Sequence, residues 1–164
     1  MLTELSCKDF AEELASKKPV PGGGGAAAMV AALGAALNTM VANFYYGKKK
    51  FIDIKDKHEE LIKRGEILRV KLIDLVNKDA EVFKPLSRAY VMPSNTDEEK
   101  ALKNKTLQRY LIEACSAPME TLEFSYDAIL LHEEILDISS KNIISDVGVG
   151  VQFLKAALNS AYLN

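Results

Sequence analysis

Cysteine is scarce in this sequence of 164 residues, which contains only Cys7 and Cys115. The two residues lie far apart and match neither the spacing of a zinc site nor that of a redox motif. A pair of isolated cysteines is typical of reduced thiols. We therefore expect a cytoplasmic protein whose fold does not depend on disulfides.

A strong net charge is also missing, because the formal charge at pH 7 is only −2. No overall field then favours nucleic acid, and any anionic partner must be bound locally. The first residues, MLTELSCKDFAEE, lack the basic and then apolar order of a signal peptide. With 48% hydrophobic and 27% charged residues, residues 1–164 are expected to form a single soluble globular domain.

Charge is absent altogether from residues 19–47, PVPGGGGAAAMVAALGAALNTMVANFYYG. The stretch shows no alternation of period two, so we expect a helix that begins near Gly24. This helix is apolar nearly all round, which predicts burial on several sides. Its many alanines and glycines would let neighbouring helices approach closely. The pattern predicts the central helix of a bundle, and one that two subunits could share.

A membrane-spanning helix is the first alternative for the same stretch. About 20 apolar residues suffice to cross a bilayer, and three lysines, residues 48–50, follow like a positive flank. Alanine and glycine contribute little to insertion, however, and Asn38, Thr39 and Asn43 interrupt the second half. We therefore favour a buried helix and no membrane partner.

The rest of the sequence also has the patterns of helices, without strands or repeats. A short helix follows the cap residue Ser6, a long one covers about residues 55–90, and a capping box at 96–99 starts another. Pro118 bends that helix or begins a new one, and the last helix covers roughly residues 143–163. Pro85 should kink the long helix. The expected fold is all-α, a bundle of five or six helices. The helix after Thr96 should face inward through Leu102, Leu107, Tyr110, Leu111 and Ala114.

The run Gly22, Gly23, Gly24, Gly25 precedes the central helix and is the first candidate site. Glycines let backbone amides approach a ligand, and a helix N-terminus favours an anion. No GK[ST] follows and no strand precedes the run, so it is not a nucleotide-binding phosphate loop. The alternative is a tight turn that lets another helix cross closely.

Asp79 is the second candidate, because it lies in the apolar stripe of the long helix between Leu75 and Val82. A carboxylate there is costly unless it is paired or protonated. Burial would raise its pKa and suit it to general acid or base chemistry. The alternative is a structural aspartate that is hydrogen-bonded to the end of a neighbouring helix.

Two polar clusters complete the candidates. Asn142, Ser145 and Asp146 share one side of a helical segment, although Ser145 or Asp146 could instead cap the last helix. Lys48 and Lys49 could bind an anion or form a solvated turn. His58 and His132 lack ligand partners nearby in sequence, so we expect surface or boundary histidines and no metal site.

Several segments of the chain resemble one known family when they are taken together and in order. They are the glycine run with its Ala-rich helix, GKKKF, KDAEVF with Tyr90 and Pro93, Ala117-Pro118, and NIISDVGVG. This combination resembles the formiminotetrahydrofolate cyclodeaminase and methenyltetrahydrofolate cyclohydrolase family. Three departures are Gly25 where the family often has serine, Pro85 inside a helix that the family keeps regular, and a C-terminus shorter than the family's.

The resemblance implies a homodimeric, all-helical enzyme that binds folate between subunits and needs no metal or redox cofactor. Formimino-tetrahydrofolate would close to methenyl-tetrahydrofolate with release of ammonia, or water would open the methenyl ring. A noncatalytic helical dimerisation subunit is an alternative from another class. On the enzyme reading, Asp79 is the leading acid or base and Asp146 the second. Amides of residues 22–25 would bind substrate, and Lys48 or Lys49 would meet the glutamate tail. Asn43, Asn142 and Ser145 would position the pterin or the reacting group.

Overall fold

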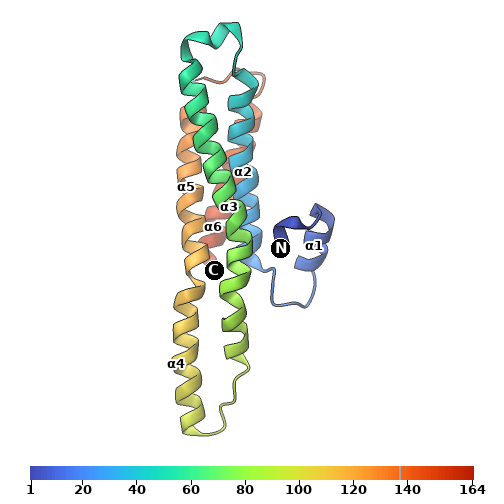
Figure 1. Ribbon diagram of the computed structural model, residues 1–164, viewed down its shortest axis with the longest axis vertical. Coiled ribbons are helices and arrows are strands. Elements are labelled where there is room, and N and C mark those ends of the chain that lie inside the picture. Colours follow the sequence, from blue (N-terminus) through green and yellow to red (C-terminus); the bar gives the residue numbers. More distant parts are fainter. Residues whose placement is uncertain (137) are drawn as a thin grey trace.

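The computed structural model describes residues 1–136 and 138–164, and the side chains of these residues except at positions 50 and 51. Every element assigned within these residues is helical, which confirms the expected all-α class (Figure 1). The α-helices are α1 (Cys7–Leu14), α2 (Gly23–Tyr45), α3 (Lys55–Tyr90), α4 (Asp97–Ala114), α5 (Ser116–Leu136) and α6 (Ile144–Leu163). Two short 3-10 helices, η1 (Leu2–Glu4) and η2 (Lys49–Ile54), precede α1 and α3.

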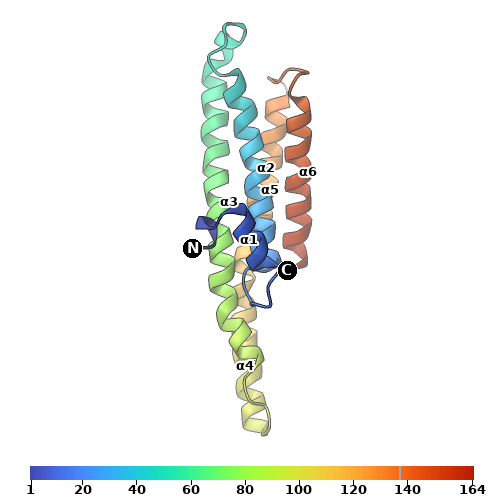
Figure 2. The same ribbon diagram turned by 90° about the vertical axis from the view of Figure 1, so that its right-hand side faces the viewer.

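Helices α2, α3, α5 and α6 lie side by side as an antiparallel bundle (Figures 1 and 2). The lower part of α3 and the whole of α4 continue beyond the bundle as a two-helix arm. Helix α1 lies to one side of the bundle, and the segment before it is hydrogen-bonded to α3. There the amide of Leu2 donates to Asn77 Oδ1 at 2.8 Å, and Asn77 Nδ2 donates to Thr3 Oγ1 at 2.8 Å.

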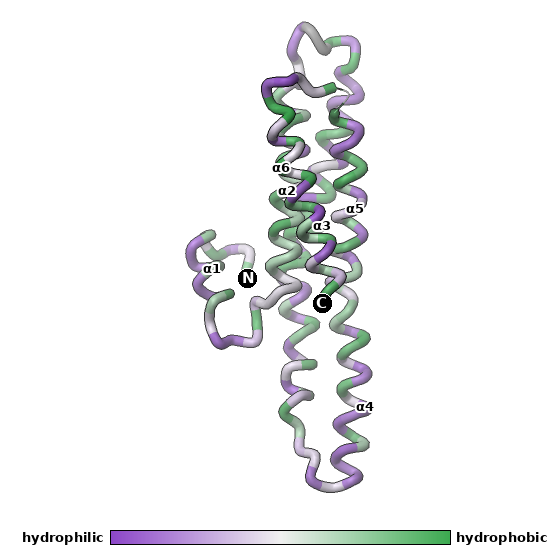
Figure 3. Tube along the Cα trace, turned by 180° about the vertical axis from the view of Figure 1, so that it is seen from behind, coloured by the Kyte–Doolittle hydropathy of each residue, from purple (hydrophilic) through white to green (hydrophobic). Residues whose placement is uncertain are grey.

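Helix α2 is the central element, as the uncharged stretch predicted. Alanines at its centre are almost inaccessible and pack with Leu72, Leu75, Val76 and Leu154 in the main core cluster. Their small side chains let α3 and α6 approach the α2 backbone closely. Figure 3 shows hydrophobic residues concentrated where α2, α5 and α6 run together. The buried alanines of this cluster are Ala28, Ala31, Ala32 and Ala35.

By length and composition, α2 is also the one helix among the described residues that could cross a membrane. In the structure, 61% of the residues in its most apolar window are buried inside the bundle. Protein therefore surrounds most of this surface, as it would surround the core helix of a globular domain.

The predicted helix boundaries agree with the structure where capping chemistry defines them. Ser6 Oγ accepts from the Asp9 amide at 3.1 Å, and Thr96 and Glu99 form both hydrogen bonds of a capping box. Pro118 belongs to the first turn of a new helix, α5, where a missing amide hydrogen costs least. Helix α3 continues across Pro85 rather than ending there. The segment between α2 and α3 contains η2.

The prediction that α4 faces inward is wrong. None of its 18 residues is buried, and Leu102 is 59% exposed. Helix α4 packs mainly on the lower part of α3, where no third helix covers the pair. The apolar spacing in α4 therefore identifies one contact face of an arm and not a core position.

The expectation that His58 and His132 lie at the surface or at its boundary is also wrong, because both side chains are fully buried. His132 Nδ1 donates to the Ala128 carbonyl oxygen at 2.8 Å, and its Nε2 has no hydrogen-bond partner among the described residues. Burial lowers the pKa of His132, and the bond to Ala128 opposes that shift in part. A Cβ atom at Gly150 would collide with His132 Nε2, so glycine in α6 makes the room for this ring.

Two glycines of α6 provide a matched test of this contact. Gly150→Ala should lower the free energy of unfolding by about 1–3 kcal/mol, because the added methyl group overpacks the site against His132. Gly148→Ala meets no atom within 4 Å and should raise it by about 0.5–1 kcal/mol through helix propensity. Urea unfolding measures both values, and equal shifts of the same sign would contradict the packing account.

Candidate functional site

The glycine run and Asp79 meet in the structure, although Gly25 and Asp79 are 54 positions apart in the chain. A Cβ atom at Gly24 would collide with Asp79 Oδ1, and one at Gly25 would lie 3.5 Å from Oδ2. The carboxyl group therefore lies directly against the first turn of α2. Only a glycine at position 24 leaves room for it.

Two opposing effects set the protonation of Asp79. Burial raises the pKa of this carboxyl group above its ordinary value, and a hydrogen bond from the Gly25 amide lowers it by less. The amide belongs to the N-terminus of α2, where the helix dipole also favours a negative charge. The group can hold a proton more readily than an exposed aspartate, and its ionised form still has a donor. This combination suits proton transfer, and it also matches the alternative of an aspartate bonded to a helix end.

A small cavity of about 130 Å³ opens beside Asp79. Its walls come from the loop before α2, the first turn of α2, the lower half of α3 and the C-terminal end of α6. Phe83 lies one helical turn after Asp79, and Asn164 follows the last residue of α6. Neither was predicted from the sequence. The lining residues are Pro19, Val20, Gly22, Gly23, Gly24, Asp79, Phe83 and Asn164.

The other predicted residues lie at the opposite end of the bundle. The Ser140 amide donates to the Tyr45 hydroxyl at 3.0 Å, which joins the C-terminal end of α2 to the loop before α6. Helix α2 has 23 residues, so about 35 Å separate its two ends at 1.5 Å per residue. The residues at the far end are Asn43, Lys48, Lys49, Asn142, Ser145 and Asp146. One protomer therefore does not bring them to the Asp79 cavity.

The far-end residues have separate local environments. Lys48 Nζ lies 3.9 Å from the centre of the Phe44 ring, a cation–π contact, and Lys49 is exposed. Asn43 is exposed beside two shallow grooves between α2 and α3. The alternative that Ser145 or Asp146 caps α6 is wrong, because Ile143 is the cap residue and no side chain caps the helix there. Asp146 instead lies in the first turn.

The described residues contain no group of three or more His, Cys, Asp or Glu side chains placed to share a metal ion.

Gly25, which stands where the family often has serine, has a simple steric environment. A Cβ atom there would lie 3.5 Å from Asp79 Oδ2 and from the Val76 carbonyl oxygen, which are ordinary contacts. The site therefore has space for the Cβ atom of a serine at this position.

Comparisons with known proteins agree on one family. The family described as formiminotransferase-cyclodeaminase matches residues 6–164. A methenyltetrahydrofolate cyclohydrolase from Methylorubrum extorquens is 40% identical over 155 residues, which are 94% of this chain and 74% of that protein. A formimidoyltransferase-cyclodeaminase from Rattus norvegicus is 31% identical over 163 residues, but the match spans only 30% of that protein.

A solved structure has the same fold. The crystal structure of formiminotetrahydrofolate cyclodeaminase from Thermotoga maritima superposes with a TM-score of 0.85 at 32% sequence identity. The match covers 99% of this chain and 77% of the other. The similarity therefore extends over the whole bundle and the arm.

The contact between Gly24 and Asp79 can be tested by moving the carboxyl group. In Gly24→Ala the new methyl group should force the Asp79 side chain out of the cavity and toward solvent. The pKa of Asp79 should then fall back toward its ordinary value, because desolvation is the main cause of its rise. Carbon-detected NMR titration of the Asp79 carboxyl group measures this shift.

Gly22→Ala is the matched control, since the nearest atom to its Cβ position is the Pro19 carbonyl oxygen at 4.0 Å. Asp79 should keep its raised pKa in that variant. An unchanged Asp79 pKa in Gly24→Ala would show that the carboxyl group does not occupy the described position.

Proposed function

Because the chain belongs to the formiminotransferase-cyclodeaminase family, we propose that it is a folate one-carbon enzyme that cyclises formimino-tetrahydrofolate to methenyl-tetrahydrofolate with release of ammonia. Membership confirms the resemblance predicted from the sequence. One observation carries the assignment to a site: the Asp79 carboxyl group, with its raised pKa, lines a cavity beside the glycine run. The substrate is expected to enter this cavity with its one-carbon unit toward Asp79.

Both proton transfers of the cyclisation can use this carboxyl group. N10 of the folate attacks the carbon of the protonated formimino group on N5, N10 loses its proton, and the C–N bond to the departing amine breaks. The amine needs a proton to leave as ammonia, and the neutral Asp79 carboxyl group can donate it. The resulting carboxylate accepts the Gly25 hydrogen bond and can take the proton that N10 loses. The one-carbon unit keeps its oxidation level, so we propose no redox cofactor and no metal.

The cyclohydrolase reaction is the second candidate, and the 40% identity to the Methylorubrum extorquens enzyme favours it. Here the carboxylate form of Asp79 would accept a proton from the water that attacks the methenyl carbon. The protonated carboxyl group then donates that proton to one folate nitrogen as its bond to the carbon breaks, and the hydroxyl group of the adduct loses its proton to solvent as the formyl C=O of formyl-tetrahydrofolate forms. The noncatalytic alternative has no comparable support, because the relatives described above are named as enzymes.

We also propose that the protein is a homodimer and that its place is the cytoplasm. The outer face of α2 carries an apolar stripe in which Leu33 is 51% exposed, Met40 38% and Phe44 52%. Such a stripe is typical of a surface that another protein covers. In an antiparallel pair, the far-end residues of one protomer would approach the Asp79 cavity of the other. The proposed binding roles of Asn43, Lys48, Lys49, Asn142 and Ser145 depend on that arrangement.

Asp79→Asn tests the proton-transfer role. The substitution keeps the shape of the side chain but removes its titratable proton, so turnover should fall about a hundredfold to ten-thousandfold. Assays with formimino-tetrahydrofolate and with methenyl-tetrahydrofolate also decide between the two reactions. Asp146→Asn is the control and should retain turnover if Asp79 is the acid or base. The reverse result would transfer the role to Asp146.

The stability of Asp79→Asn against pH separates loss of chemistry from loss of fold. Because the folded pKa of Asp79 is raised, its contribution to stability is fully present below the unfolded pKa and is lost as the pH rises through the folded pKa. Asparagine does not titrate in this range. The free energy of unfolding of the variant, minus that of the wild type, should therefore become more positive as the pH rises. Unfolding of the variant at every pH would favour a structural role.

The dimer should depend on the exposed stripe of α2. Phe44→Glu places a charge in the proposed interface and should shift the protein toward monomer in sedimentation experiments at micromolar concentration. Ile112→Glu is a matched control on the arm, where Ile112 is 75% exposed, and should leave the mass unchanged. Ala31 and Ala35 are unsuitable probes, because both are buried inside the protomer. A monomeric wild-type protein would rule out the dimer.

A further inference from the structure

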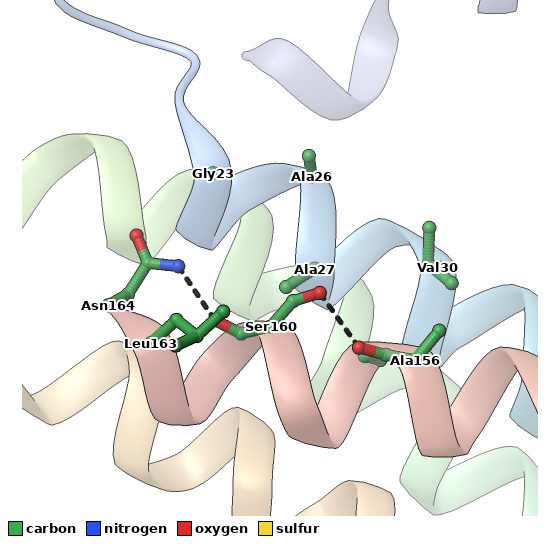
Figure 4. Close-up of a pocket in the computed structure, with 9 residues that line it drawn as sticks. Gly23, Ala26, Ala27, Val30, Ala156, Ser160, Leu163 and Asn164 are labelled. Carbon is green, nitrogen blue, oxygen red and sulfur yellow. Dashed lines mark hydrogen bonds between the residues drawn. The ribbon is translucent and has the colours of Figure 1, made fainter.

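A second hollow adjoins the Asp79 cavity along the line where α2 and α6 meet. It is a groove of about 350 Å³, and it shares Gly23 and Asn164 with the cavity (Figure 4). The two spaces are therefore neighbours, and the region around Gly23 and Asn164 is the junction between them. The groove is lined by Gly23, Ala26, Ala27, Val30, Ala156, Ala157, Ser160, Leu163 and Asn164.

The polar groups of the groove are turned toward the α6 backbone. Ser160 Oγ donates to the Ala156 carbonyl oxygen at 2.8 Å, and Asn164 Nδ2 donates to the Ser160 carbonyl oxygen at 2.9 Å (Figure 4). The Ser160 hydroxyl and one N–H group of Asn164 are thereby occupied, and alanine methyl groups form most of the remaining wall. The groove therefore presents an apolar surface along its length.

The junction of the two spaces has a different character. Asn164 Oδ1 lies 3.3 Å from the position of a Cβ atom on Gly23. The nitrogen of the same amide group donates to Ser160, and the oxygen is the acceptor that Asn164 offers at the junction. Asp79 lies on the far side of the cavity, close to Gly24. A ligand that crosses the junction would meet an acceptor there and a carboxyl group beyond it.

We infer that the groove between α2 and α6 binds the aminobenzoyl ring of a reduced folate while the pterin ring occupies the Asp79 cavity. This inference rests on the proposed function. The one-carbon unit of a reduced folate is carried on N5 and N10, between the pterin and the benzene ring. A ligand with one ring in each space therefore places the reacting carbon at the junction, within reach of Asp79.

The chemistry of each ring matches the space assigned to it. The pterin has a polar edge, and its cavity offers a carboxyl group, glycine backbone and one aromatic side chain, Phe83. The benzene ring is apolar and flat, as is the space between two rows of alanines. Together the two spaces have a volume within the range of about 300–1,000 Å³ that is typical of small-molecule sites.

A second copy of this chain is the competing occupant of the groove. The apolar stripe of α2 that includes Leu33 continues the same helix face above Val30. Large side chains project along that stripe, whereas the groove is a hollow between small ones. A contact between copies along the stripe would leave the hollow to be filled by something else, and its position next to the Asp79 cavity favours the substrate.

The test fills the groove and compares two ligands. Ala156→Leu places a larger side chain in the groove, and Ala101→Leu is the matched control at an exposed position of α4. Calorimetry measures the binding of 5-formyl-tetrahydrofolate and of a tetrahydropterin that lacks the aminobenzoyl group. Ala156→Leu should weaken binding of the folate by about tenfold or more, which is at least about 1.4 kcal/mol. Its affinity for the pterin should stay within about twofold of the wild-type value, and Ala101→Leu should change neither.

Several results would overturn the assignment. They are an unchanged folate affinity in Ala156→Leu, an equal loss for both ligands, a wild-type protein that binds no reduced folate, and a weakened dimer with folate affinity intact. Ala26→Leu fills the groove from α2 and repeats the test if Ala156→Leu does not fold. Calorimetry needs no turnover, so it can contradict binding in the groove without contradicting the proposed activity. Conversely, an inactive protein that still shows the selective loss would contradict the activity alone.

Discussion

The close approach of α3 and α6 to the backbone of α2 is the contact on which the rest of this structure depends. Alanine and glycine on α2 remove the side-chain layer that normally separates two helices. A Cβ atom at Gly34, for example, would lie 3.0 Å from the Gly150 carbonyl oxygen of α6. Interiors are packed densely enough that a single methylene matters. The thin surface of α2 therefore sets both neighbouring helices, and through them Asp79 and Asn164, beside the glycine run.

The same thinness allows polar side chains to lie inside the bundle. A Cβ atom at Gly65 would lie 2.5 Å from Thr39 Oγ1, so this glycine of α3 makes room for a polar group of α2. The side chain of Asn38 is fully buried, and neither of its polar atoms has a hydrogen-bond partner within the described residues. Each such group costs about 1–3 kcal/mol, which the apolar core around it must offset. The core thus combines tight apolar packing with a few buried polar groups held in spaces that glycines provide.

The proposed functional residues divide between the two ends of the bundle. The Asp79 end has a cavity, a carboxyl group of raised pKa and helix amides. The other end has two lysines after α2, Lys48 and Lys49, and the polar side chains of Asn142, Ser145 and Asp146 near the start of α6. A rigid bundle cannot bring its two ends together, so the proposal that both groups bind one substrate requires two protomers. The exposed apolar stripe on α2 offers a surface for that pairing.

Much of the fold could be predicted from local chemistry. The cap residue Ser6, the capping box at Thr96 and the uncharged stretch of α2 each act through neighbours in sequence, so their positions were legible without the structure. Asp79 could be identified because a carboxylate interrupts an apolar stripe on one helix. The resemblance of the whole chain to its family came from motifs that are likewise continuous in the sequence.

Only the tertiary structure decided which of these residues meet. Asp79 and Gly24 are far apart in sequence, and Asn164 joins them from a third helix, so no periodicity on one element could reveal the cavity. The burial of His132 depends on a glycine in α6, and the exposure of Leu102 depends on the arm extending beyond the bundle. Sequence periodicity reports the face on which a helix makes contact. What that face contacts is determined by how helices distant in the chain pack together.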